Sequence, residues 1–225
     1  MDIDNSQNKN SKKVIFFNIP NILTLSRIIL GIIFFSLVIV YKILKSKISY
    51  DSEIFLLITL FFVFVIAIIT DGLDGFFARK LNIVTNFGKH FDPLADSIFF
   101  IFVFFSFVII GIMGWYFFLI IFLREFIMHI FLRPFVKKRG FYLGANITGK
   151  IKMFLQCALS LIIILSIIIK KILINKNIDT SIINLYDNIF AINSLIFFTI
   201  IVCLSIFSFF VYILDVKKML KNKTL

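Results

Sequence analysis

Four aspartates are the residues of this sequence whose types and spacing best suit chemistry. Asp71 and Asp74 are three residues apart, and Asp92 and Asp96 are four apart. Residues at these spacings lie on one face of a helix. The stretch between Arg79 and Asp92 is long enough to form a turn that returns the chain to the same place. We therefore expect four carboxylates to converge where two consecutive helices meet.

Anions gathered in a poorly solvated place repel one another, and a divalent cation relieves that repulsion. Ligation by carboxylate oxygens favours Mg²⁺ or Mn²⁺ over zinc. Two cysteines, Cys157 and Cys203, stand too far apart to suggest a zinc site. A hard metal with open positions polarises a phosphate or diphosphate. Gly72, Gly75 and Ala78 lack bulk, so a ligand can approach this helix closely.

The elements that carry these residues must be membrane-spanning helices. Of the 225 residues, 60% are hydrophobic and 16% charged, whereas a soluble domain averages about 45–50% and about 25%. The composition excludes an ordinary soluble globule and predicts an all-α polytopic membrane protein with a polar cavity facing the cytoplasm. Residues 1–13 are predicted to be a disordered polar tail, and residues 14–225 one membrane domain. Six apolar stretches approach the roughly 20 residues that a span needs: 21–41, 54–77, 94–112, 115–135, 147–169 and 189–216.

The basic residues predict the orientation in the membrane. The net charge is +12, but the cations lie in short segments between apolar runs, which argues against nucleic-acid binding and follows the positive-inside rule. With six spans both termini share one side, which collects sixteen Lys and Arg residues against six on the other. We therefore expect both termini, and the turn after the second span, to lie in the cytoplasm, with the protein in the cell membrane.

Other interpretations of the aspartates remain open at this point. A charge inside an apolar span costs about 2.5–3.5 kcal/mol on insertion scales, so each needs a reason. Three interpretations are open: the four aspartates set the topology, they line the path of a divalent-cation transporter, or they form a catalytic site. A transporter predicts acids near the bilayer midplane on several separated helices, whereas these cluster at the ends of two consecutive ones. A purely structural membrane subunit leaves them unexplained.

One segment of the chain resembles the complete signature of the CDP-alcohol phosphatidyltransferases, with the signature residues at the signature spacing. It reads Asp71-Gly-Leu-Asp74-Gly75-Phe-Phe-Ala78-Arg79 and continues to Gly88, Asp92 and Asp96. Six spans with this motif across the second and third also resemble that family. The resemblance implies transfer of a phosphatidyl group from CDP-diacylglycerol to an alcohol, with release of CMP. It also implies one or two Mg²⁺ or Mn²⁺ ions and a homodimer.

The resemblance further implies a role for each motif residue. Asp71, Asp74 and Asp92 would bind the metal. Asp96 would accept the proton of the attacking hydroxyl and would also touch metal. The CDP site would comprise the small residues and the arginine of the motif, namely Gly75, Ala78, Arg79 and Gly88.

The acceptor alcohol is expected to be anionic. Arg124 lies about halfway along the fourth apolar stretch, and Lys150 and Lys152 lie in the first turns of the fifth. Cations in a low-dielectric site suit a phosphate-bearing alcohol such as glycerol 3-phosphate. The alternative is that Arg124 pairs with Glu125 or another carboxylate while the lysines reach to lipid head groups.

The chain's opening also bears on the acceptor. The segment from Asn18 to Arg27 resembles the opening of bacterial phosphatidylglycerophosphate synthases, a branch of the same family. Cardiolipin synthases, which use phosphatidylglycerol as acceptor, open similarly and are the nearest alternative. Both groups often carry Lys where this chain has Ser97. Glu125 and His129 are four residues apart, but one such pair is weak evidence for a metal site.

Overall fold

The structure, a computed structural model, describes residues 19–80, 88–139 and 147–223. These residues form α-helices, with one short π-helical segment, η1, and no strand among them. The elements are α2 (Ile19–Leu44), α3 (Tyr50–Lys80), α4 (Gly88–Ile109), α5 (Trp115–Ile127), η1 (Met128–Leu132), α6 (Arg133–Lys138), α7 (Ile147–Asn175) and α8 (Thr180–Lys223). The predicted tail, residues 1–13, lies outside the described residues.

Within the described ranges, six helical segments are long and apolar enough to cross a membrane, with α5, η1 and α6 together forming the fourth. The all-α, six-span prediction is therefore confirmed. The helices extend beyond the predicted apolar stretches, most of all α8, which covers residues 180–223 rather than 189–216. It begins earlier because the Asp179 carboxylate accepts a hydrogen bond from the Ser181 N–H (3.1 Å), which stabilises a polar first turn.

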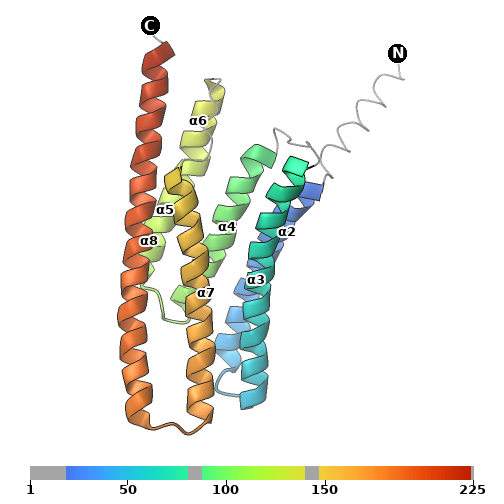
Figure 1. The fold of residues 1–225 in the computed structure, drawn as a ribbon, viewed down its shortest axis with the longest axis vertical. Helices are drawn as coiled ribbons and strands as arrows, with labels where there is room; N and C mark the ends of the chain where they lie inside the picture. The colour runs from blue at the N-terminus through green and yellow to red at the C-terminus, as the bar shows by residue number, and fades with distance from the viewer. Residues whose placement is uncertain (1–18, 81–87, 140–146, 224–225) are drawn as a thin grey trace, which may run out of the picture.

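The helices form an elongated bundle (Figure 1). On one side α2 packs against α3 and α4, and on the other α7 packs against α8; contacts of α3 with α7 and of α5 with α8 and α4 join the two. The turns at 45–49 and 176–179 lie together at one end of the bundle (Figure 1). The start of α2, the end of α3, the starts of α4 and α7 and the end of α8 lie toward the other end. We call these the turn end and the site end.

Phenylalanines fill the space between the first three helices. Phe34 of α2, Phe64 of α3 and Phe99 of α4 are buried, with ring centroids 6.0 Å apart for the first pair and 5.8 Å for the second. Above them Gly31 lets α2 approach α4, because a Cβ there would lie 3.3 Å from the Phe99 Cα. Because of this close approach, the residues of α2 and α4 that lie one turn nearer the site end come into contact.

A short connection joins α4 to α5. Gly111 has a φ of +83°, a conformation that side-chain-bearing residues rarely adopt, and α5 begins at Trp115. The third and fourth spans therefore form a tight helical hairpin. It fixes α5 beside α4, so that residues of the two helices face each other nearer the site end.

Candidate active site

Arg27 of α2 joins two of the four aspartates. Its guanidinium forms an ion pair with Asp71 of α3 (Nη2 to Oδ1, 2.8 Å) and another with Asp96 of α4. The arginine side chain is 2% exposed, whereas Asp71 and Asp96 are 34% and 20% exposed. A buried cation thus holds carboxylates from two different helices at one point, and these carboxylates keep access to solvent or ligand.

Thr24, one turn before Arg27 on the same face of α2, contacts a third aspartate. Its hydroxyl donates a hydrogen bond to Asp92 Oδ1 (2.7 Å), and Thr24 is buried. The charges of Arg27 and Asp71 also act on Asp92. Three of the four predicted carboxylates are therefore gathered around two residues of α2. We call Arg27, Thr24, Asp71, Asp92 and Asp96 the acidic cluster.

The rest of the motif occupies the ends of the two helices around this cluster. Asp74, Gly75, Ala78 and Arg79 belong to the last turns of α3, and Gly88 is the first residue of α4. Their side chains lie outside the described residues, as do residues 81–87 between the helices. The expected roles of Asp74 in metal binding and of the other four in the CDP site therefore stay predictions.

The acidic cluster suits a hard divalent metal by its donor chemistry. The donors are carboxylates and one hydroxyl, which are the ligands that Mg²⁺ and Mn²⁺ prefer. Asp71 and Asp96 already meet at a common cation, the Arg27 guanidinium. Among the side chains that the structure describes, which exclude that of Asp74, no three acidic, His or Cys groups are arranged to hold a metal ion. Completing such a site thus requires Asp74 or a rearrangement around Arg27.

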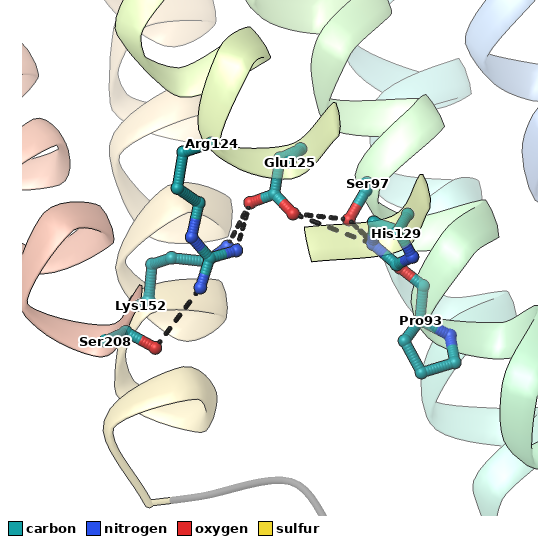
Figure 2. A network of polar contacts seen from close by, with 7 residues as sticks. All are labelled: Pro93, Ser97, Arg124, Glu125, His129, Lys152 and Ser208. Carbon is teal, nitrogen blue, oxygen red and sulfur yellow. Dashed lines mark hydrogen bonds and ion pairs between the residues drawn. The ribbon is translucent and has the colours of Figure 1, made fainter. Parts of the chain in front are cut away.

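A second buried cluster centres on Glu125 of α5 (Figure 2). Its Oε1 accepts hydrogen bonds from Lys152 Nζ of α7 (2.5 Å) and from Arg124 Nη1 (2.7 Å). Arg124 Nη2 also donates to Ser208 Oγ of α8 (3.3 Å). The side chains of Glu125, Arg124 and Lys152 are 6%, 10% and 11% exposed. Two cations from α5 and α7 therefore share one carboxylate in a nearly dry environment.

The other carboxylate oxygen of Glu125 faces α4. Ser97 Oγ lies 2.9 Å from Glu125 Oε2 and 2.9 Å from His129 Nε2, and His129 Nε2 lies 3.7 Å from Glu125 Oε2 (Figure 2). His129 belongs to the π-helical segment η1. Such segments are rare and occur frequently at functional sites. Together these contacts define the basic cluster: Ser97, Arg124, Glu125, His129, Lys152 and Ser208.

Charge is unbalanced in the basic cluster. Arg124 and Lys152 carry two positive charges against one on Glu125, and Arg133 adds positive potential at Lys152 and His129. Arg124 Nε is buried and has no hydrogen-bond partner among the described residues. The cluster therefore retains both positive charge and an unused N–H donor, which suit an anion. Lys150, two residues before Lys152, is exposed and makes none of these contacts.

The two clusters meet at adjacent residues of α4. Asp96 is bound by Arg27, and Ser97 is bound by Glu125 and His129. One turn of α4 therefore carries both the predicted base and a contact of the basic cluster. Surplus negative charge on one side and surplus positive charge on the other provide adjacent places for a metal and for an anionic group.

Sequence reasoning missed Arg27, Thr24 and the central place of Glu125. Arg27 and Thr24 stood in the segment that resembles the synthase opening, but no chemical role was expected for them. The available signal was the position of Arg27 inside the first apolar stretch, where a charge is costly and requires a partner. The pairing of Arg124 with Glu125 was an open alternative, and the structure shows that contact.

Comparison with known proteins agrees with the motif. The CDP-alcohol phosphatidyltransferase family matches residues 17–183. Proteins named CDP-diacylglycerol–glycerol-3-phosphate 3-phosphatidyltransferase are similar to this chain. The Bacillus subtilis protein is 36% identical over 141 residues (62% of this chain, 72% of that protein), and the Mycoplasma pneumoniae protein 33% over 141 residues (60% and 62%).

A third relative, from Aquifex aeolicus, carries the same name and is 45% identical over 82 residues, which cover 36% of this chain and 38% of that protein. The alignments thus span between about two fifths and about three quarters of these relatives. The family match covers most of the described membrane spans and both halves of the aspartate motif. This chain therefore belongs to the CDP-alcohol phosphatidyltransferase family.

Proposed function

We propose that this protein transfers the phosphatidyl group of CDP-diacylglycerol to glycerol 3-phosphate, forming phosphatidylglycerophosphate and CMP. Membership of the family supports the donor, and the names of the similar proteins support the acceptor. The observation that carries the choice of acceptor is the contact between Ser97 and Glu125. It joins a buried cluster with surplus positive charge to the residue next to Asp96.

The acidic cluster serves the donor in this proposal. Asp71, Asp74 and Asp92 are the proposed ligands of one or two Mg²⁺ or Mn²⁺ ions, with Asp96 in contact with them. Such an ion, when bound, would neutralise the charge of the diphosphate and so favour the departure of CMP. The small residues and the arginine around these ligands would then hold CDP: Gly75, Ala78, Arg79 and Gly88.

The basic cluster serves the acceptor. Arg124 and Lys152 bind the phosphate of glycerol 3-phosphate, while Glu125 keeps both side chains in place. Buried cations hold a phosphate more strongly than exposed ones do, because little water competes. Lys150 was also expected to bind this phosphate; since it is exposed, its contribution is expected to be the smallest of the three.

The proposed reaction is a single displacement at phosphorus. The acceptor hydroxyl oxygen forms a bond to the phosphorus that bears diacylglycerol, and the bond from that phosphorus to the oxygen bridging it to CMP breaks. Asp96 takes the proton of the hydroxyl as it attacks, and CMP carries away the negative charge. Anchoring the acceptor phosphate beside Ser97 would bring its hydroxyl close to Asp96.

The test is CMP release by purified protein in detergent with CDP-diacylglycerol and Mg²⁺ or Mn²⁺. Glycerol 3-phosphate, phosphatidylglycerol, serine and inositol are offered separately, and release with glycerol 3-phosphate alone is expected. Release with phosphatidylglycerol alone would make the protein a cardiolipin synthase and leave Arg124 a structural partner of Glu125. Absence of release with every acceptor, together with metal-ion transport in vesicles, would favour the transporter.

The orientation is part of the same proposal. The protein lies in the cell membrane with both termini in the cytoplasm and a polar cavity open to that side. The start of α2 and the end of α8 lie toward the same end of the bundle (Figure 1), which supports a shared side for the termini. Labelling of cysteines introduced near residues 10 and 224 in intact cells would test it. The homodimer implied by the family resemblance stays a prediction.

A further inference from the structure

Arg27 has no part in the reaction described above, yet it is the most deeply buried charged side chain of the acidic cluster. A buried arginine in a membrane span is costly without partners. Its partners are Asp71 and Asp96, two residues proposed to contact the metal. The guanidinium therefore occupies the same carboxylates that the metal needs.

Two cations cannot share these carboxylates without penalty. A divalent ion close enough to bind Asp71 and Asp96 would lie a few ångströms from the guanidinium, and like charges at that distance in a poorly solvated site repel strongly. In addition, each carboxylate oxygen that bonds to Arg27 has less negative charge to offer a metal. The binding of metal and the double ion pair of Arg27 therefore oppose each other.

We propose that Arg27 is an internal counter-cation that holds Asp71 and Asp96 together before metal binds and competes with the metal for them. This inference rests on the proposed metal site. It makes Arg27 a positioning residue, since it acts through the aspartates. Metal then binds a preassembled pair of carboxylates, at the expense of part of its affinity, because it must weaken the contacts of Arg27.

Thr24 provides a matched contrast on the same helix face. It too is buried and contacts one of the aspartates, Asp92, but through a neutral hydroxyl. Its removal takes away a hydrogen bond without removing a competing charge. If Arg27 only held the helices together, loss of Arg27 and loss of Thr24 would affect metal binding in the same direction.

The experiment measures binding of Mn²⁺ alone, without CDP-diacylglycerol, to full-length protein in detergent, by the loss of the free Mn²⁺ electron paramagnetic resonance signal. Thermal unfolding in EDTA and in Mn²⁺ is recorded in parallel. The variants are Arg27→Gln and Arg27→Met, which remove the charge, Arg27→Lys, which keeps it, and Thr24→Val. The methionine of Arg27→Met adds no polar group of its own to the buried site, so this variant guards against failure of the glutamine variant to fold.

We expect both charge-removing variants to bind Mn²⁺ about tenfold more tightly than the unchanged protein. In EDTA they should unfold at a lower temperature than the unchanged protein. Addition of Mn²⁺ should raise their unfolding temperature by more than it raises that of the unchanged protein. Arg27→Lys should bind like the unchanged protein, and Thr24→Val should bind equally or more weakly. The proposed competition would be overturned if the unchanged protein binds Mn²⁺ and the charge-removing variants bind it equally or more weakly. Absence of binding by the unchanged protein would overturn the proposed metal site as well.

Discussion

The two ends of the bundle use buried and half-buried charges differently. At the turn end the ions pair one to one: Lys171 of α7 with Glu53 of α3 (2.5 Å), and Lys170 with Asp187 of α8 (2.7 Å). At the site end one arginine serves two aspartates, and one glutamate serves two cations. Matched pairs are complete without a ligand. Unmatched clusters keep charge that a ligand of opposite sign can complete, which is why we assign function to the site end.

The strongest challenge to this contrast is Asp96→Asn. The change is nearly isosteric but removes the proposed base, so CMP release should fall by about 10³-fold. Binding of CDP-diacylglycerol should remain, because the other aspartates are intact. Both are measured on the same purified protein, by CMP release and by equilibrium binding. Substantial residual transfer would remove Asp96 from the role of base.

Removing the shared carboxylate of the basic cluster should mainly affect stability. In Glu125→Leu two buried cations lose their counter-charge, and the free energy of unfolding should fall by about 3 kcal/mol. The matched control is Glu53→Leu at the turn end, where the remaining cation, Lys171, is 27% exposed and can reach water. Thermal unfolding should show a larger loss of stability for Glu125→Leu than for Glu53→Leu. Glycerol 3-phosphate should restore more of the lost stability in Glu125→Leu. Equal losses would argue that the two ends do not differ.

Arg124→Ala probes the surplus positive charge directly. We expect the KM for glycerol 3-phosphate to rise about 10- to 100-fold, the range for loss of charged hydrogen bonds, with little change in the KM for CDP-diacylglycerol. Lys152→Met should act in the same direction, and the exposed Lys150 provides the control, with a much smaller rise for Lys150→Ala. An unchanged acceptor KM in Arg124→Ala would remove this residue from the acceptor site.

The smallest effect is expected at the turn end. Lys170 and Asp187 are each 40% exposed, so Lys170→Ala should change the free energy of unfolding by less than about 1 kcal/mol and leave both KM values unchanged. Denaturation and steady-state kinetics of this one variant check both statements. A clear rise in the acceptor KM would show that ion pairs far from the aspartates also shape the site.

Sequence patterns predicted the parts of this molecule that depend on composition and spacing. Long apolar stretches predicted six spans, and the spacing from Asp71 to Asp96 predicted that their carboxylates converge, of which three are described together around α2. The partners of these carboxylates were harder to predict. Arg27 meets Asp71 and Asp96 because Gly31 lets α2 approach α4, and such a contact between distant segments leaves no periodic signal.

The basic cluster shows the same limit. The cations Arg124 and Lys152 were recognised, and their pairing with Glu125 was considered for Arg124 alone. The contact of Ser97 with His129 joins α4 to the π-helical segment, and a contact between segments 32 residues apart leaves no periodic signal in the sequence. The length of α8 was also underestimated, because apolar content ends before the helix does.

That length has a consequence for how the protein sits in a bilayer. At 1.5 Å per residue, the 44 residues of α8 extend about 66 Å, whereas a bilayer with its head groups is about 40–45 Å thick. An upright α8 therefore extends beyond the membrane. Its exposed Lys217 and Lys218 lie near its C-terminal end, at Lys223. Each lysine held near an anionic membrane surface adds about 1 kcal/mol of attraction. This end of α8 should therefore bind a membrane rich in anionic lipid more strongly than a neutral one.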